Sequence, residues 1–222
     1  MTRRCKTAIL ISGTGSNLQA FIDAVQGGDL NLELSVVVSN NSDAFGLVRA
    51  RDAGIPTACI EHTLFPDRET FDRTVAARLD EWQPELLVLA GFMRILSAGF
   101  VKHYAGKILN IHPALLPAYP GLNTHQRVLD AGEKWHGSTV HFVTEELDSG
   151  PRILQGRLPV IAGESSGELA SRVQAIEHQI YPEAAGWFGD GRVEFRQGRT
   201  WIDGDVADKP VVQTFSRDGA LV

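Results

Sequence analysis

The sequence predicts a doubly wound α/β fold: a mostly parallel open sheet, a long C-terminal helix and a small closing hairpin. Short apolar runs alternate with amphipathic segments over the first two-thirds of the 222 residues. The apolar runs are rich in Ile, Leu and Val and do not alternate with polar residues, as expected for parallel strands buried on both faces. Regular alternation of such strands with helices is typical of a doubly wound sheet.

Five strands and four helices follow from these runs in chain order. The strands are expected at residues 7–11, 34–38, 57–60, 86–90 and 108–111, and the helices at residues 18–25, 46–53, 68–82 and 98–104. Each strand is short and is followed by a polar residue or glycine, where a loop would begin.

The pattern changes after Pro113. A proline-rich loop at 116–121 precedes a helix near 124–131, and two β-like runs follow, at 138–143 and 153–160, separated by the turn signal Asp148-Ser149-Gly150-Pro151. A long helix is expected over about 167–188, with Pro182 kinking it or marking a boundary. Runs at 193–196 and 200–202 predict the closing hairpin. We expect one domain over 1–202 and a C-terminal tail over 203–222, whose weak signals predict poor order.

Composition limits the class of protein. Hydrophobic residues make up 43% and charged residues 22% of the chain, which is ordinary for a globular protein. The formal net charge is -6, and no Lys/Arg cluster occurs, which argues against a nucleic-acid partner. No signal peptide or membrane-spanning run is visible, and the two cysteines lack any pairing or metal-binding pattern. We therefore expect a soluble, cytoplasmic protein without a membrane partner, either a monomer or a homodimer.

The loop between the first strand and the first helix, Ser12-Gly13-Thr14-Gly15-Ser16-Asn17, has the composition of an anion site. Glycine permits close approach of a ligand, and the free amides at a helix start can hold a phosphate. A dinucleotide fingerprint is excluded because Leu18 replaces its third small residue, and a P-loop lacks its Gly-Lys-Ser/Thr. The loop therefore predicts a site for one phosphate, with Ser16 and Asn17 as polar partners. The alternative is a plain turn in which Asn17 caps the helix.

A second polar group, Asn110-Ile111-His112, lies at the carboxyl end of the fifth strand, the rim where open α/β sheets bind ligands. Residues two apart on a strand face the same side, so an amide donor and an imidazole can converge on one atom. Asp148 would then orient His112 and favour the imidazolium. The alternatives are an ordinary polar histidine and an ordinary turn aspartate. The other histidines have no ligand spacing, so no metal site is predicted.

Several blocks, in order, resemble the phosphoribosylglycinamide formyltransferases, the folate-dependent enzymes of purine synthesis. They are residues 10–19 (LISGTGSNLQ), 89–96 (LAGFMRIL), 109–117 (LNIHPALLP), 119–122 (YPGL), 136–143 (HGSTVHFV) and 147–151 (LDSGP). The likeness extends from about residue 8 to 188. Asn123 and Ala118 depart from the family, where histidine and a basic residue are common.

The resemblance implies a Rossmann-like formyltransferase fold and transfer of a formyl group from 10-formyltetrahydrofolate to the amine of 5'-phosphoribosylglycinamide through a tetrahedral intermediate. It implies that Asn110, His112 and Asp148 are catalytic. Because the sequence has neither a ligand cluster nor a complete dinucleotide fingerprint, we expect that neither a metal nor a nicotinamide is needed. The phosphoribosylglycinamide site would comprise Gly15, Ser16, Asn17, Gln174, Ala175, Ile176 and Glu177. The folate site would comprise Arg68, Met93, Arg94, Ile95, Leu96, Asn110, Thr144, Glu145, Glu146, Leu147 and Asp148.

Three other functions remain open at this stage. A 10-formyltetrahydrofolate hydrolase shares the catalytic trio but carries an added N-terminal regulatory domain, for which the first strand at residue 7 leaves no room. Methionyl-tRNA formyltransferase shares Asn-x-His but adds a C-terminal domain for tRNA, and the residues after Phe188 are too few and too acidic for one. The non-enzymatic alternative is a phosphate-binding module in which the trio is incidental.

Overall fold

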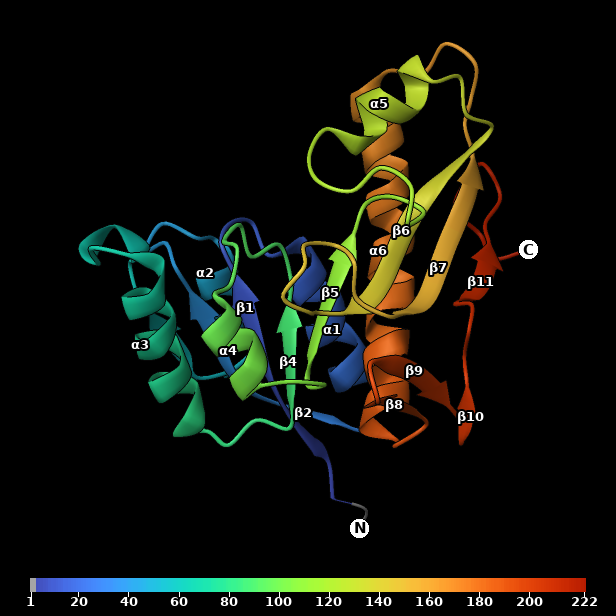
Figure 1. Ribbon diagram of the computed structural model, residues 1–222. Coiled ribbons are helices and arrows are strands. Elements are labelled where there is room, and N and C mark those ends of the chain that lie inside the picture. The colour runs from blue at the N-terminus through green and yellow to red at the C-terminus, as the bar shows by residue number, and fades with distance from the viewer. Residues whose placement is uncertain (1–2) are drawn as a thin grey trace.

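The first five strands run parallel, as their apolar character predicts. The computed structural model describes residues 3–222 and contains an eight-stranded main sheet (Figure 1). Its parallel part consists of β1 (Cys5–Ile11), β2 (Leu32–Ser39), β3 (Thr57–Cys59), β4 (Leu86–Leu89) and β5 (Ile108–His112). The predicted strands are confirmed, with ends that differ by one or two residues.

The second half of the sheet contains one strand that runs antiparallel to its neighbours. β6 (Trp135–Phe142) pairs antiparallel with both β5 and β7 (Arg152–Pro159), and β11 (Val211–Thr214) pairs parallel with β7. The strand order is β11-β7-β6-β5-β4-β1-β2-β3. The chain winds outward in one direction from β1 and in the other from β4, so these neighbours form the topological switch point, where doubly wound sheets bind ligands.

Helices cover both faces of this sheet (Figure 1). One face carries α1 (Ser16–Gly27), α2 (Gly46–Asp52), α5 (Thr124–Asp130) and α6 (Ser166–Gly189), and the other carries α3 (Arg68–Asp80) and α4 (Ala98–His103). Along β1, Ile9 and Ile11 pack toward the first group and Ala8 and Leu10 toward the second. The run is apolar throughout because both faces of the strand are covered. A short 3-10 helix, η1 (His62–Leu64), was not predicted.

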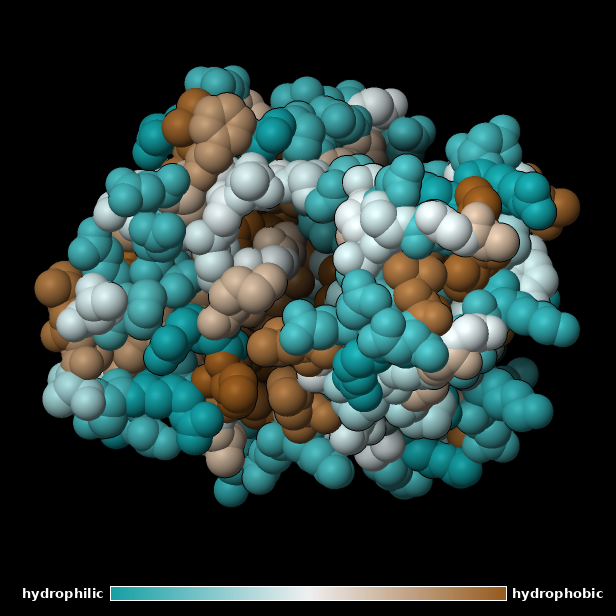
Figure 2. Space-filling view, turned by 90° about the horizontal axis from the view of Figure 1, so that it is seen from above, coloured by the Kyte–Doolittle hydropathy of each residue, from teal (hydrophilic) through white to brown (hydrophobic). Residues whose placement is uncertain are grey.

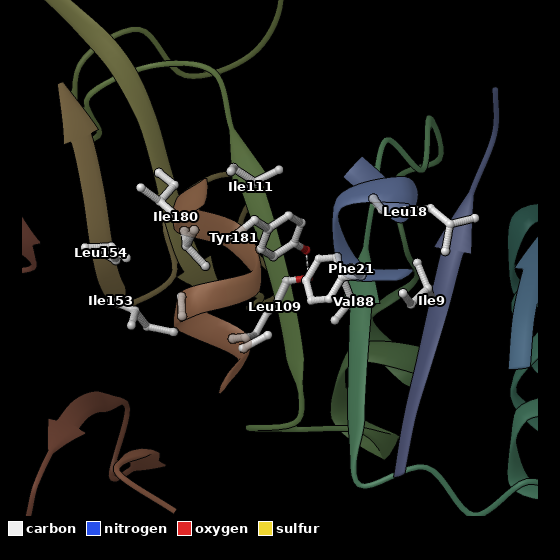
Figure 3. Packing of buried hydrophobic residues seen from close by; sticks show 14 of the residues in the cluster. Ile9, Leu18, Phe21, Val88, Leu109, Ile111, Ile153, Leu154, Ile180 and Tyr181 are labelled. Carbon is white, nitrogen blue, oxygen red and sulfur yellow. Dashed lines mark hydrogen bonds between the residues drawn. The ribbon is translucent and has the colours of Figure 1, made fainter. Parts of the chain in front are cut away.

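Tyr181 of α6 hydrogen-bonds to β4 and β5 at the centre of the sheet (Figure 3). It is fully buried, and its ring packs edge-on against Phe21 of α1 with 5.2 Å between ring centroids. Its hydroxyl lies 3.1 Å from the carbonyl oxygen of Leu89 and 2.9 Å from that of Leu109. A buried tyrosine needs such a partner for its hydroxyl. The contact fixes α6 against the strands that carry the candidate site.

Pro182 is not a boundary, because α6 continues through it to Gly189. Proline removes one helical donor and disfavours the preceding turn. Here the ring is buried with Tyr181, Ala184 and Ala185 on the face that packs against the sheet. The apolar packing of a long helix, which begins with a capping box between Ser165 and Glu168, outweighs that local cost.

The residues after β9 are more regular than expected. The hairpin of β8 (Val193–Arg196) and β9 (Arg199–Ile202) is confirmed, and β10 (Asp205–Val206) extends it to three strands. β11 then joins the main sheet, and Phe215 is buried against Ile180 and Gly156. This segment lies in the stretch for which the sequence predicts a poorly ordered tail. In the structure its strand pairs with β7 and its aromatic ring enters the core. No helix in residues 3–222 combines the length and apolarity needed to cross a membrane.

Candidate active site

Three strand ends meet at the switch point and carry the candidate residues. The loop after β1 contains Gly15 to Asn17, the loop after β4 contains Met93 to Leu96, and β5 ends at His112. Figure 2 looks onto this edge of the molecule and shows a hollow with hydrophobic residues inside it and at its rim. Two adjoining cavities lie there, one beside the β1 loop and one beside β5.

Gly15 shapes the loop after β1. It occupies the N-cap of α1 with φ of 71°, a left-handed conformation that disfavours side chains. A Cβ at Gly15 would also lie 2.7 Å from the Cα of Gly46 at the start of α2. Arg49 steadies the same loop by donating from Nε to the carbonyl of Thr14 at 2.9 Å. The first amides of α1 have no partner within the helix and can bind an anion.

Asn17 points into the protein instead of capping the helix, so the capping alternative is wrong. The N-cap is Gly15, and Asn17 Nδ2 donates to Glu177 Oε2 at 3.2 Å. Its Oδ1 is buried and has no hydrogen-bond partner among the described residues. Ser16 Oγ accepts from Gln174 Nε2 at 3.1 Å, which joins the loop to α6. These contacts place polar atoms from both elements around one space.

That space is a cavity of about 400 Å³, which we call the polar cavity. Five of the residues predicted for the phosphoribosylglycinamide site line it: Gly15, Ser16, Asn17, Gln174 and Glu177. Ala175 and Ile176 do not. Ala175 is exposed on another face of α6, and Ile176 belongs to the hydrophobic core, because successive helical residues point in different directions.

His112 and Asp148 meet, although they come from distant parts of the chain. His112 Nδ1 lies 3.4 Å from Asp148 Oδ2, and both side chains are only 7% exposed. The carboxylate also accepts from the amide of Gly121 at 2.9 Å. On the other side of the ring, His112 Nε2 lies 2.9 Å from the carbonyl oxygen of Tyr119, which can only accept. Both ring nitrogens therefore face hydrogen-bond acceptors.

Asn110 is oriented by a histidine that sequence reasoning missed. Its Nδ2 lies 3.2 Å from Nε2 of His141, the residue opposite it on β6. Burial lowers the pKa of His141, so the ring is neutral. Because its Nδ1 donates to the carbonyl of Phe142 at 2.9 Å, its Nε2 must accept from Asn110. One hydrogen of the Asn110 amide is thus used, and the other is available to the cavity.

A second histidine that was missed, His125, stands between the two cavities and lines both. Its Nδ1 lies 2.9 Å from Nε2 of His136. Burial lowers the pKa of both rings, to about 3 for His136. A neutral, hydrogen-bonded pair therefore forms part of the wall next to His112. Isolated histidines give little signal in a sequence, but the cross-strand register of β5 and β6 would have placed His141 opposite Asn110.

The second cavity, about 740 Å³, is mainly apolar, and we call it the apolar cavity. Ten predicted residues line it: Met93, Arg94, Ile95, Leu96, Asn110, Thr144, Glu145, Glu146, Leu147 and Asp148. His112 lines it too. Met93, Ile95, Leu122 and Leu147 are more than half exposed, so this cavity presents apolar side chains to an incoming ligand. Arg68 is not in its wall. It begins α3, and its guanidinium reaches Glu69 at 3.5 Å.

Residues 3–222 contain no group of three or more His, Cys, Asp or Glu side chains suited to a metal ion. Asn110, His112 and Asp148 instead form a cluster that can donate hydrogen bonds to a developing oxyanion and transfer a proton.

The sequence of residues 5–185 matches the protein family described as formyl transferase. The chain belongs to the formyl transferase family. The matched region includes both cavities and every candidate residue named above.

Relatives within the formyl transferase family are highly similar. The chain is 53% identical over 196 residues to the phosphoribosylglycinamide formyltransferase of Escherichia coli, covering 88% of this chain and 92% of that protein. The solved structure of a phosphoribosylglycinamide formyltransferase from Coxiella burnetii has a TM-score of 0.90 at 48% identity, covering 94% of this chain and 99% of that one. A formyltetrahydrofolate deformylase from Pseudomonas syringae is more distant, with a TM-score of 0.82 at 25% identity, and the match covers 90% of this chain and 66% of that one.

Proposed function

We infer that this chain is a phosphoribosylglycinamide formyltransferase, which transfers a formyl group from 10-formyltetrahydrofolate to the amine of 5'-phosphoribosylglycinamide in purine synthesis. The observation that carries this inference is the junction of the two cavities. They share Gly91, Met93, Ile111, Pro113 and His125 in their walls, and Asn110 and His112 lie beside this junction. A formyl donor in the apolar cavity and an amine in the polar cavity would meet there.

The reaction needs one bond to form and one to break. The amine nitrogen attacks the formyl carbon, and the carbonyl oxygen becomes an oxyanion in a tetrahedral intermediate. The bond from this carbon to the folate nitrogen then breaks, and the attacking nitrogen loses a proton while the folate nitrogen gains one. The products are the formamide and the unformylated folate. The protein must stabilise the oxyanion and carry the proton.

Asn110 and His112 are the groups proposed for the oxyanion. The free hydrogen of the Asn110 amide faces the cavity because His141 holds the other one. His112 Nε2 is directed at the Tyr119 carbonyl, an oxygen acceptor of the kind that the intermediate would present. For His112 Nε2 to donate to the substrate, its contact with the Tyr119 carbonyl must therefore break. Loss of one oxyanion donor typically lowers the rate by ~10²–10³.

Asp148 is proposed to keep His112 charged and oriented. Its carboxylate lies next to Nδ1 and is itself held by the Gly121 amide. With Nδ1 bound in this way, the ring can give a proton from Nε2 to the leaving nitrogen and recover one from the attacking amine, a role that typically contributes ~10²–10⁴.

The polar cavity is proposed to bind the phosphorylated substrate, with the phosphate at the amides of Gly15, Ser16 and Asn17 and the rest of the molecule toward Gln174 and Glu177. The formyl donor would occupy the apolar cavity between Met93–Leu96 and Thr144–Asp148. A second substrate cavity favours transfer over hydrolysis, because a hydrolase delivers the formyl group to water. No metal or nicotinamide is proposed to take part.

Mass spectrometry of the products tests this function. The purified chain, incubated with 10-formyltetrahydrofolate and phosphoribosylglycinamide, should yield the formylated glycinamide and unformylated folate in equal amounts. Prior extensive chelation should leave the yield unchanged. Release of formate without the formylated amine would contradict the proposal, as would activity restored after chelation by one specific divalent ion.

A further inference from the structure

Three oxygen atoms form a continuous row from the polar cavity to the end of β5. Glu177 Oε1 lies 2.9 Å from Ser138 Oγ, and Ser138 Oγ lies 2.7 Å from the backbone carbonyl oxygen of His112. The other carboxyl oxygen of Glu177 accepts from Asn17 at 3.2 Å. The row therefore joins a residue of the substrate cavity to the backbone of the proposed catalytic histidine.

The number of protons decides how this row is bonded. Ser138 has one hydroxyl proton, and the His112 carbonyl has none, so the shorter contact requires Ser138 to donate to His112. The contact with Glu177 then needs a proton on Glu177 Oε1. If Glu177 were ionised, the single serine proton would lie between two acceptors, and only one of the two short contacts would contain a proton. The His112 carbonyl also accepts from the Ala114 amide at 2.8 Å and so has a partner in either state. Only the protonated acid places a proton in both contacts of the row.

The surroundings of Glu177 also oppose a negative charge. The residue is 8% exposed, and none of the ion pairs formed by the described residues includes it. Burial raises the pKa of its carboxyl, and this effect outweighs the hydrogen bonds with Asn17 and Ser138, which lower the pKa. An unpaired buried carboxylate is strongly disfavoured.

Among the titratable residues near Glu177, Tyr181 lies one turn further along α6, His125 on α5 lines the same cavity and contacts His136, and His112 on β5 is joined to Glu177 through Ser138. Tyr181 is a fully buried phenol, and burial keeps His125 and His136 neutral by lowering the pKa of each ring. His112 reaches Glu177 only through Ser138, and its ring faces Asp148.

We propose that Glu177 is a neutral carboxylic acid in the free protein at neutral pH, and that its proton directs Ser138 toward the carbonyl of His112. Glu177 is thereby a positioning residue for the end of β5. It is also a specificity residue, because a neutral acid beside the Gly15–Asn17 loop leaves the polar cavity open to a phosphorylated ligand, which a second buried anion would repel. This second consequence rests on the proposed function, whereas the protonation state does not.

NMR titration of the full chain, labelled with ¹³C at the glutamate carboxyl carbons and without substrate, tests the proposal. The Glu177 signal, identified by its loss in Glu177→Gln, should have the chemical shift of a protonated acid at pH 7, where the exposed glutamates are ionised. A carboxylate shift at pH 7 would overturn the proposal. Glu183→Gln, on the same helix, is the matched control and should leave the Glu177 signal in place.

Ser138→Ala gives the direction of the hydrogen bond. If Ser138 accepts from the acid, its loss removes an acceptor that stabilises the neutral form, and the titration midpoint of Glu177 should fall by about one pH unit. A rise would mean that Ser138 donates to an ionised carboxylate, and the proposal would be wrong. Should this variant not fold, the wild-type titration still decides the protonation state.

Kinetics separate this inference from the proposed function. In the wild type, KM for the phosphorylated amine should rise as the pH passes the Glu177 midpoint, with kcat less affected, and Glu177→Gln should lose that rise. Absence of formyl transfer would reject the proposed function and leave the NMR result standing. Formyl transfer together with an ionised Glu177 at pH 7 would reject only this inference.

Discussion

The two cavities that adjoin beside His112 differ in the groups that they offer to a ligand. The polar cavity depends on backbone amides at the start of α1 and on the buried polar side chains of Asn17 and Glu177. The apolar cavity carries exposed apolar side chains at its rim and, deeper in, the cluster of Asn110, His112 and Asp148. The side chains of the cluster are held in place by polar contacts, Asn110 by His141 and His112 by Asp148, so the cluster should control the rate of reaction. The loop of residues 15–17 offers backbone amides to a ligand, so it should control substrate binding.

The largest effect is expected from His112→Ala. Removal of a group that both donates to the oxyanion and carries a proton should lower kcat by about 10²–10⁴ and leave KM for both substrates within a few-fold. Steady-state kinetics check this. His103→Ala is the control, because His103 is exposed and paired with Asp80 away from the cavities. A kcat that stays within a few-fold of the wild type would remove His112 from the mechanism.

A smaller loss of kcat is expected from Asp148→Asn, which keeps the shape of the side chain and removes its charge. The imidazolium of His112 then loses its counter-charge, so the neutral ring is favoured and the pH optimum of kcat should move to lower pH. The pH–rate profile, with NMR signals of the His112 ring followed in both proteins, measures this. Full activity with an unchanged profile would return Asp148 to the role of a turn residue.

On the polar side, Gly15→Ala should act through the backbone. A side chain at a left-handed position costs about 1–2 kcal/mol, and here it would also press against Gly46. Urea unfolding should show this loss of stability, with weaker binding of the phosphorylated amine. Gly13→Ala is the matched control, because a Cβ there meets nothing within 4 Å. Equal losses in both variants would contradict the special role of Gly15.

Asn17→Ala should have the mildest effect. It removes one side-chain partner from the polar cavity and should raise KM for the phosphorylated amine about tenfold, the equivalent of one hydrogen bond, while kcat changes little. A loss confined to kcat would mean that Asn17 acts in catalysis and not in substrate binding, and would contradict the role given to the polar cavity.

The elements of the fold that could be predicted from the sequence are those whose burial leaves a clear pattern. The parallel strands were found because burial on both faces leaves an uninterrupted apolar run, as in Ile9 to Ile11. β11 was missed because Val211 and Val212 form a short, partly exposed edge strand. Of the two alternatives for Pro182, a kink or a boundary, the boundary is wrong, because packing of the whole helix outweighs the local propensity of proline.

At the site, predictions tied to a particular loop or strand end agreed best with the structure. Asn110 and His112 share a face of β5, and the β6–β7 turn brings Asp148 to them. Most residues assigned by resemblance alone, such as Gln174 and Glu177, also line a cavity. Arg68, Ala175 and Ile176 were assigned in the same way and lie outside the cavity walls. His125 and His141 were missed. The partner of His141 is set by the pairing of β5 with β6, and the partner of His125 by the position of α5 beside β6. A single histidine in the sequence reveals neither.

The most direct test of the account is the rate at which 10-formyltetrahydrofolate loses its formyl group with the phosphorylated amine present, with the amine absent, and with the same amine lacking its phosphate. The two-cavity account predicts rapid loss only with the phosphorylated amine and a lower kcat/KM without the phosphate. Equal rates with and without the amine would show that the formyl group goes to water, and would contradict the account.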